Sequence, residues 1–371
     1  MDTPIDVIVS GHLCLDLLPD MAHVKPDNLT KPGHMSEAGP ITLSTGGVVS
    51  NTGLALHRLG VNVRLMAGVG NDLLGRVIIE FLSARDPSLS ELISIIPDQP
   101  SSYTVVLSPL NADRAFIHCT GTNDTFGEET INFSLLSQAK IFHLGYPPLL
   151  PRLMRNDGEE SEIIFRKAKA TGVVTSLDMT LPDANGVSGR VNWRRLLERT
   201  LPYVDIFLPS IEEILFMLRR DDYERWHGNV LSHLTRRYLS TLADELLTMG
   251  TVITGFKLGE MGMYLHTGEA AHFDRLERLQ LDVQSWANAR VYQPTFAVTV
   301  AGTTGAGDSA YAALFASLLR GMNPEDTLRF ANAVGACNVE AIDSTSGIRT
   351  WDETELRIRS GWAANPVYLP E

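Results

Sequence analysis

The sequence predicts an α/β fold in which a doubly wound, mostly parallel sheet carries helices on both faces and a small β-lid at one side. Two observations support this class. Short apolar runs alternate with helical stretches along most of the chain, and two segments interrupt that alternation. The chain has 371 residues, of which 44% are apolar and 20% charged, so it can bury a sizeable core. We expect a single domain over residues 1–371.

The strand candidates are short and apolar, as expected of buried parallel strands. They cover Ile5–Gly11, Val61–Ala67, Ile141–Gly145, Val173–Asp178, Val204–Leu208 and Val252–Lys257. The segments between them, and the C-terminal part, have helical patterns. The predicted helices cover Asn51–Leu59, Leu73–Ala84, Ser161–Ala170, Val191–Thr200, Ile211–Arg220, Ala310–Arg320 and Asp326–Ala341. Repeated strand–helix order favours a parallel sheet covered on both faces.

Two segments depart from this order and together predict the lid. Residues 14–43 are rich in Pro, Gly and His and read as an excursion that leaves the sheet and returns. Residues 101–120 contain two short extended runs joined by a turn, which is typical of a hairpin. These runs are Tyr103–Leu107 and Ala115–Cys119. Two further stretches lack a clear hydrophobic periodicity and are expected to be insertions, namely Asp221–Tyr238 and Glu269–Pro294.

Composition excludes several classes of function. The net charge is −13, from 44 acidic and 31 basic residues, which argues against a nucleic-acid-binding surface. Three widely spaced cysteines form no zinc-like cluster and predict reduced core thiols. The N-terminus lacks a signal peptide, and no apolar run approaches 18 residues. We therefore expect a cytoplasmic protein that binds small molecules rather than membranes or nucleic acid.

The most informative stretch is Gly305-Ala306-Gly307-Asp308, which opens the helix Ala310–Arg320. Glycine amides at a helix N-terminus can hold a phosphoryl group as its charge develops. A carboxylate beside them can accept the proton of an attacking hydroxyl. A Gly-rich turn with Asp308 as a plain helix cap explains the residues equally well.

A second glycine turn, Gly46-Gly47, opens the helix that contains Asn51. The paired glycines can let a ligand approach the backbone, and Asn51 offers a donor and an acceptor to sugar hydroxyls, although it can also be an ordinary cap. Asp16 follows the first strand at a carboxyl end, where open α/β sheets bind ligands. Its carboxylate can bind two hydroxyls, or it can be a solvated loop acid.

Acidic and glycine residues also follow later strands. Glu212 or Glu213 can hold a hydrated magnesium ion, or simply favour a helix N-terminus. Lys257-Leu258-Gly259-Glu260-Met261-Gly262 can border a nucleotide or connect two strands. The spacing of Gly68, Gly70 and Gly75 does not fit a dinucleotide site, and no P-loop is present. His12, His118 and His143 are expected to be core residues.

Together these motifs resemble the PfkB-type, or ribokinase-like, carbohydrate kinase family from about Ile5 to about Gly347. Three segments carry the resemblance in order: Gly46-Gly47-x-x-x-Asn51, Gly68-x-Gly70-x-Asp72-x-x-Gly75 and Thr303-Thr304-Gly305-Ala306-Gly307-Asp308. The resemblance implies a ribokinase-like α/β body with a β-lid, and ATP and Mg²⁺ as cofactors.

Carried over residue by residue, the resemblance implies that Asp308 is the catalytic base and that Glu213 organises magnesium through water. The anion hole would be formed by Gly305, Ala306 and Gly307. The substrate hydroxyls would be contacted by Asp16, Gly46, Gly47 and Asn51. The nucleotide would be bound by Lys257, Gly259, Gly262, Thr304 and Asn332.

Two departures qualify the resemblance. Ser210 stands where the family's Asn-x-x-Glu element has Asn, which implies an altered magnesium shell. Gly302 stands where many members have an Asp that contributes to a monovalent-cation site, which leaves potassium activation open.

We expect an ATP-dependent kinase that phosphorylates a hydroxyl, chiefly a primary CH2OH, of a sugar or related polyol. One alternative is a nucleoside kinase of the same family, for which Tyr103 and Phe116 are the lid aromatics. Another is a non-catalytic sugar- or nucleotide-binding regulatory protein. A sugar phosphate would favour basic lid residues, for which Lys25, Lys31 and Arg114 are candidates. Open strand edges of the lid favour a homodimer.

Overall fold

A nine-stranded sheet forms the centre of the computed structural model, which describes residues 4–112, 115–226 and 228–371. The strand order is β13-β12-β11-β10-β9-β8-β1-β4-β5, and every neighbouring pair from β11 to β5 is parallel. The strands are β1 (Ile5–Gly11), β4 (Val63–Gly70), β5 (Ile93–Ile96), β8 (Ala139–Gly145), β9 (Val174–Asp178), β10 (Ile206–Phe207), β11 (Ile253–Lys257), β12 (Met263–Thr267) and β13 (Arg290–Gln293). The predicted parallel sheet is confirmed.

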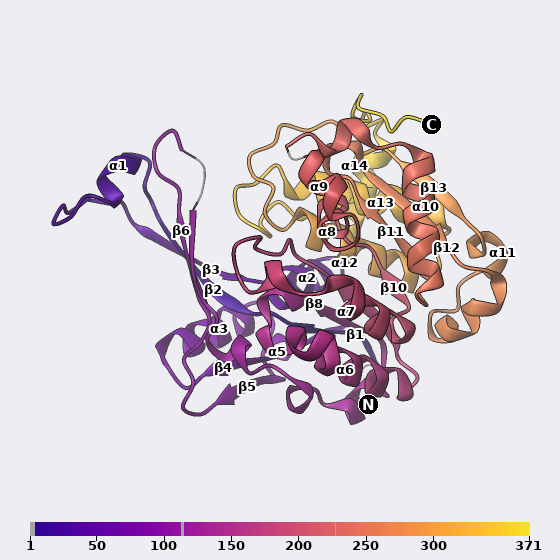
Figure 1. Cartoon of the computed structure of the whole chain (residues 1–371), viewed down its shortest axis with the longest axis horizontal. Coiled ribbons are helices and arrows are strands. Elements are labelled where there is room, and N and C mark those ends of the chain that lie inside the picture. The colour runs from indigo at the N-terminus through magenta and orange to yellow at the C-terminus, as the bar shows by residue number, and fades with distance from the viewer. Residues whose placement is uncertain (1–3, 113–114, 227) are drawn as a thin grey trace.

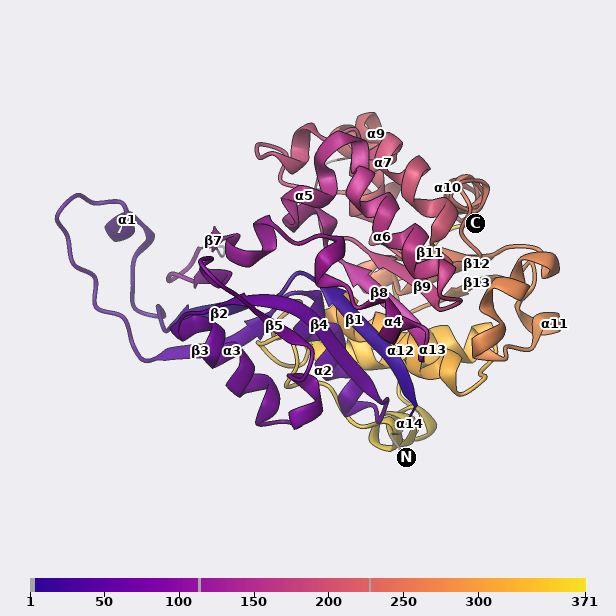
Figure 2. The same cartoon turned by 90° about the horizontal axis from the view of Figure 1, so that it is seen from below.

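Helices cover both faces, because side chains of each strand alternate between two cores (Figure 2). In β1, Val7 and Val9 enter one core and Ile8 the other. On the first face lie α2 (Val48–Arg58), α3 (Leu73–Ser83), α12 (Ala306–Leu319) and α13 (Pro324–Asn338), with α14 (Trp351–Arg359) outside them. On the other lie α6 (Glu159–Ala170), α7 (Trp193–Thr200), α8 (Ile211–Leu218) and α10 (Arg236–Thr248).

A separate four-stranded sheet forms the lid and projects from the body (Figure 1). Its order is β3-β2-β6-β7. The strands are β2 (Cys14–Pro19), β3 (Ile41–Gly46), β6 (Tyr103–Leu107) and β7 (Ala115–Cys119), and α1 (Pro26–Leu29) lies at the far end. The predicted hairpin has the expected bounds, while the excursion runs three residues beyond the expected end. Arg114, the proposed basic candidate, lies outside the described residues.

The two expected insertions are only partly additions to the fold. Residues 290–293 of the second one are β13, an edge strand paired antiparallel with β12. The hydrophobic periodicity of this stretch is weak because the strand has only four residues and lies at the sheet edge. The segment before it holds the 3-10 helix η10 (Ala270–Leu279) and α11 (Val283–Trp286). The first stretch contains α9 (Arg220–Arg225), which follows α8, and the start of α10.

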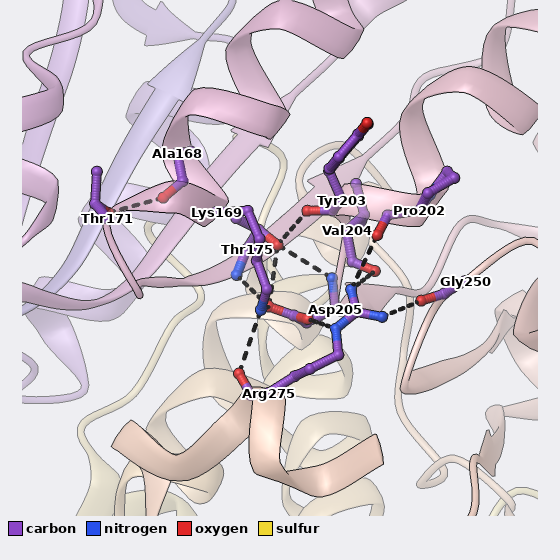
Figure 3. A network of polar contacts seen from close by, with 10 residues as sticks. All are labelled: Ala168, Lys169, Thr171, Thr175, Pro202, Tyr203, Val204, Asp205, Gly250 and Arg275. Carbon is purple, nitrogen blue, oxygen red and sulfur yellow. Dashed lines mark hydrogen bonds and ion pairs between the residues drawn. The ribbon is translucent and has the colours of Figure 1, made fainter. Parts of the chain in front are cut away.

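A buried polar network fastens η10 to the amino ends of β9 and β10 (Figure 3). Asp205, fully buried, accepts hydrogen bonds from the backbone N of Thr175 at 2.9 Å and from the Lys169 ammonium at 2.5 Å. The Arg275 guanidinium pairs with its other oxygen at 2.8 Å. We call Lys169, Thr175, Asp205 and Arg275 the amino-end network. It joins α6, two strands and η10.

Helix α12 brings the functional edge of the sheet together. Eleven of its fourteen residues are buried, because it packs between α2, α13 and the sheet. Small alanines allow this close approach, and Tyr311 reaches the strands by donating a hydrogen bond to the Leu177 carbonyl at 2.9 Å. The first turn of α12 therefore lies at the carboxyl ends of β8 and β9. Within the described part of the chain, every helix is too short or too polar to cross a membrane.

Candidate active site

The N-terminus of α12 is shaped by glycines, as the sequence predicts. Gly305 has φ 76°, and a Cβ there would lie 2.5 Å from the Ser344 carbonyl oxygen, so a side chain would be strained and would clash. The Ala306 amide donates to the Thr303 carbonyl at 3.3 Å. The Gly307 amide follows it in the first turn of α12, where backbone N–H groups have no intrahelical acceptor. This end of the helix is suited to an anion.

Asp308 sits in this first turn and is 2% exposed. Its Oδ2 accepts hydrogen bonds from Asn51 Nδ2 at 3.0 Å and from the Tyr146 hydroxyl at 2.7 Å. Its Oδ1 accepts from Thr52 Oγ1 at 3.1 Å. Burial raises the pKa of Asp308, whereas these three hydrogen bonds and the charge of Lys257 hold it down. The carboxylate is therefore fixed in orientation by three donors.

Two of these three donors were not predicted. Tyr146 follows β8 directly and has φ 67°, an uncommon backbone conformation for a side chain of this size. Burial and the Asp308 charge raise its pKa, so it remains a protonated donor. Thr52 is adjacent to Asn51, and the two contact Asp308 together across 256 and 257 residues of sequence. Only its place next to a predicted ligand residue could have indicated Thr52.

Further acidic side chains lie at the neighbouring strand ends. Lys257, at the end of β11, pairs with Asp178, at the end of β9, over 2.8 Å. Burial raises the pKa of Asp178 to about 6 and that of Glu213 to about 7, and Lys257 opposes both shifts. We call Asp178, Glu213, Lys257 and Asp308 the carboxylate cluster. It sets three acids against one ammonium, so bound positive charge would stabilise it.

Glu213 begins α8 in a capping box. Its backbone N donates to Ser210 Oγ at 3.4 Å, while its own Oε2 accepts from the Ser210 backbone N at 2.7 Å. One carboxylate oxygen is thus engaged and the half-buried side chain still reaches the cavity. Among the described residues, no three acid, His or Cys side chains converge as a metal site. The cluster fits a hydrated Mg²⁺ that takes few protein ligands.

A cavity of about 710 Å³ runs along this edge. Its lining includes the polar side chains of Asp308, Lys257 and Glu213 and the apolar side chains of Phe296 and Val339. The sequence-predicted residues that line it are Lys257, Gly259, Gly262, Gly305, Ala306, Gly307, Asp308, Asn332 and Glu213. The predicted Thr304 does not line the cavity, whereas the neighbouring Thr303 does. The Thr304 carbonyl accepts a hydrogen bond from Asn338 Nδ2 at 3.0 Å.

The lid residues Asp16 and Gly46 meet directly. Asp16 lies on β2, opposite β3, and a Cβ on Gly46 would come within 2.3 Å of its Oδ2. A Cβ on Gly47, whose φ is 89°, would lie 2.4 Å from the carbonyl oxygen of His12. Gly46 therefore leaves room for the Asp16 carboxylate within the lid, and Gly47 is required by its close approach to the His12 backbone, in addition to any approach by a ligand. Burial raises the pKa of Asp16 to about 6.

Two of the three histidines differ from the expectation of satisfied core residues. His118 is exposed on β7, where its Nδ1 lies 3.0 Å from Thr104 Oγ1. His12 is 3% exposed, and neither ring nitrogen has a partner among the described residues. The two rings are 5.4 Å apart, and burial lowers the pKa of His12 to about 3. A neutral buried imidazole beside Gly47 is an unused hydrogen-bonding group between lid and body.

Comparison with known proteins assigns this arrangement to a family. The profile described as "pfkB family carbohydrate kinase" matches residues 6–351. The chain belongs to the pfkB family of carbohydrate kinases. The kinase is similar to the 2-dehydro-3-deoxygluconokinase of Bacillus subtilis, with 23% identity over 86% of this chain and 87% of that protein.

It is also similar to the nucleoside kinase of Methanothermobacter thermautotrophicus, with 21% identity over 97% of this chain and 98% of that protein. Among solved structures, the Arabidopsis thaliana ribokinase complexed with ribose and ATP superimposes with a TM-score of 0.71. That pair is 18% identical and covers 95% of this chain and 98% of the ribokinase. The predicted ribokinase-like fold is confirmed.

The two departures from the family pattern have structural consequences in this kinase. A Cβ on Gly302 would lie 2.8 Å from the carbonyl oxygen of Ile342, so an Asp does not fit there without a backbone shift. Ser210 serves as the N-cap of α8 and holds Glu213 in its capping box. The serine thus positions the acid while offering a shorter side chain than Asn toward the cavity.

Proposed function

We propose that this kinase transfers the γ-phosphoryl group of ATP to a hydroxyl, chiefly a primary CH2OH, of a sugar or related polyol. The observation that carries the proposal is the placement of Asp308. This buried carboxylate lies in the first turn of α12, is oriented by three donors, and opens onto the large cavity.

Asp308 would act as the general base. Its bonds to Asn51, Thr52 and Tyr146 fix the carboxylate plane, so that a hydroxyl arriving from the lid side finds an acceptor at a set position. The substrate oxygen would attack the γ-phosphorus in line as its proton passes to Asp308. The amides of Gly305, Ala306 and Gly307 would stabilise the developing charge, with the Ala306 amide leaving the Thr303 carbonyl to take part.

ATP would occupy the cavity with its phosphates toward Asp308 and its base toward Phe296 and Val339. Lys257 supports this direction, because a Cβ on Gly307 would come within 3.4 Å of its ammonium, which places that charge beside the anion hole. Gly259, Gly262, Thr304 and Asn332 then belong to the sides of the nucleotide site, with Thr304 acting through its backbone.

Magnesium would be held by Glu213, through water, with Asp178 close by. When bound, the ion would shield the phosphate oxygens and draw electron density from the leaving group. The excess of carboxylates in the cluster supports a divalent cation. Burial is the main cause of the raised pKa values of Glu213 and Asp178, and bound positive charge would favour their ionised forms.

Substrate hydroxyls would bind between the lid and α2, at Asp16, Gly46, Gly47 and Asn51. Asn51 supports this placement, because its Nδ2 is used by Asp308 while its buried Oδ1 has no partner within the described residues. The ring nitrogens of His12, which likewise lack a hydrogen-bond partner in the described part of the chain, lie beside Gly47. We add His12 to the substrate site.

The decisive experiment is Asp308→Asn assayed with ATP–Mg²⁺ against ribose, fructose, 2-dehydro-3-deoxygluconate and adenosine. We expect the wild type to phosphorylate at least one, and the variant to lose roughly 10²- to 10⁴-fold in kcat while remaining folded. Asp274→Asn, at an exposed position on η10, is the matched control and should keep full activity.

The proposal is contradicted if the wild type phosphorylates none of the acceptors, or if Asp308→Asn keeps full activity. ATP binding without any product would favour a non-catalytic regulatory protein. A preference for adenosine would favour the nucleoside kinase alternative, in which Tyr103 and the exposed Phe116 contact the base.

We also propose that the lid mediates a homodimer. Its edge strands β3 and β7 expose Ile41 (56%), Phe116 (63%) and Ile117 (57%), and an uncovered apolar strand edge favours pairing with another chain. Light scattering of the wild type beside Phe116→Ser with Ile117→Ser tests this. Monomeric wild type at micromolar concentration would contradict it.

A further inference from the structure

The C-terminal tail, residues 361–371, follows α14 and lies beyond the region matched by the family profile, which ends at residue 351. One tail residue, Asn365, lines the large cavity together with residues from the family core. The tail therefore contributes to the wall of a cavity that is otherwise lined by residues of the family-matched region.

Backbone hydrogen bonds join the tail to one wall of the cavity. Ala297 N donates to the Ala363 carbonyl at 2.9 Å, and Asn365 N donates to the Thr295 carbonyl at 2.8 Å. Between these bonds, Phe296 and Ala364 form an antiparallel bridge. The tail thus pairs like a short strand with residues 295–297, all three of which line the cavity.

The Asn365 side chain joins the same wall to a second one. Its Nδ2 donates to the Glu260 carbonyl at 2.8 Å. Glu260 belongs to the turn η9 (Gly259–Met261), where Gly259 and Glu260 both line the cavity. Asn365 therefore fixes the distance between residues 295–297 and η9.

Trp362 supports the apolar part of the first wall. Its ring stacks on Phe296 with centroids 4.5 Å apart, and its Nε1 donates to the Ala297 carbonyl at 2.9 Å. The Arg357 guanidinium lies 3.6 Å from the Trp362 ring centroid and is itself paired with Glu340 at 2.7 Å. Phe296 is thus backed by a side chain of the tail.

The end of the tail is anchored as well. Leu369 is 4% exposed, and its backbone N donates a hydrogen bond to the Tyr292 hydroxyl at 3.0 Å. Arg236 N donates to the Pro370 carbonyl at 2.9 Å. Since the tail is held on both sides of Asn365, the position of that residue is fixed before any ligand arrives.

We propose that the tail forms part of the nucleotide site: it supports the apolar cavity wall at Phe296, and Asn365 is a positioning residue that sets the width of the slot for the base. This inference rests on the proposed function, in which the phosphates lie at the Asp308 end. The tail contacts neither Asp16 nor the lid in any bond described above, so its effect should fall on ATP and spare the sugar.

The test compares Asn365→Ala and Trp362→Ala with Tyr368→Ala, a tail residue that is 62% exposed. Kd for ATP–Mg²⁺ is measured by calorimetry, and KM for ATP, KM for the acceptor and kcat by steady-state kinetics. We expect ATP Kd and KM to rise roughly fivefold to tenfold in the first two variants, as for the loss of one or two hydrogen bonds. Acceptor KM, kcat and the Tyr368→Ala values should stay within about twofold of the wild type.

Unchanged ATP Kd and KM in both variants would overturn the inference, and so would equal effects on ATP and acceptor. The calorimetric measurement distinguishes a failure of this inference from a failure of the proposed function. If the wild type binds ATP–Mg²⁺ but phosphorylates no acceptor, the proposed function fails, whereas a raised Kd in the two variants still supports the tail. A wild type that does not bind ATP–Mg²⁺ overturns the inference outright.

Discussion

Two buried acid–base groups lie at opposite ends of the same strands and differ in charge balance. In the amino-end network, the carboxylate of Asp205 faces both Lys169 and Arg275 and also accepts a backbone hydrogen bond. In the carboxylate cluster, three acids share Lys257. Both are built on β9 and on segments flanking β10, so burial in one sheet does not by itself distinguish them.

Under the proposed function, this difference in charge balance separates a structural role for the amino-end network from a chemical role for the carboxylate cluster. Asp205 has its positive charge supplied by the fold, so the network can fasten η10 and needs nothing further. In the carboxylate cluster one ammonium faces three acids, and burial raises the pKa of Asp178 and Glu213, so the proposed magnesium ion would supply the missing positive charge. Three predictions test this contrast.

Of these three, the largest effect is expected from Lys257→Met. Burial disfavours the Lys257 ammonium, yet the charges of Asp178 and Glu213 raise its pKa, so it is charged at neutral pH. Losing it should lower kcat roughly 10²- to 10³-fold, as for removal of a group that stabilises transition-state charge. Because Lys257 holds down the pKa of Asp308, the acid limb of the kcat/KM profile should move to higher pH.

The matched control is Lys169→Met, which removes the lysine of the amino-end network. It should leave kcat and the pH profile unchanged. Equal losses of kcat in both lysine variants would show that the two groups do not differ in role.

A smaller effect, on stability, is expected from Asp205→Asn. The change leaves Lys169 and Arg275 without their carboxylate, and these side chains are 22% and 29% exposed. Removal of one partner from a fully buried pair costs about 3–5 kcal/mol. Solvent reaches these cations, so we expect the free energy of unfolding to fall by roughly 2 kcal/mol.

Urea unfolding measures this change, and kcat per folded molecule should be preserved. Asp178→Asn provides the comparison from the other end of β9: it should affect stability less, because it relieves a cluster with excess negative charge. A larger loss of stability in Asp178→Asn than in Asp205→Asn would reverse the assignment of roles.

The smallest expected effect is the pH dependence of stability without ligands. Glu213 and Asp178 have pKa values of about 7 and about 6 in the folded state, above their ordinary values near 4. Their stabilising contribution is thus present below about pH 4 and is lost as pH rises through 6 to 7. Between pH 5 and 7.5, Glu213→Gln should reduce the decline of the melting temperature by roughly 2–4 °C.

Calorimetric melting at several pH values provides the measurement. Glu212→Gln, an exposed neighbour in the same first turn of α8, should leave the slope as in the wild type. Identical slopes in the wild type and Glu213→Gln would show that Glu213 does not titrate in this range.

Most of the fold was accessible from the sequence because its signals are local. The strand–helix alternation, the hairpin Tyr103–Leu107 with Ala115–Cys119, and the glycine turns each depend on neighbouring residues. The edge strand β13 was missed because four residues in an irregular stretch carry too little period. The strand is instead fixed by its antiparallel hydrogen bonding with β12, which the local sequence pattern does not show.

The sequence by itself determined six of the nine strands of the sheet, the lid and the motif around Gly305 and Asp308, since spacing and residue type suffice for these. Only the tertiary structure decided which side chains surround Asp308: Thr52 and Tyr146 reach it from α2 and from the end of β8. It also decided the charge balance of the two buried groups. Burial and charge depend on residues distant in sequence, so neither can be read from the segment that carries the acid.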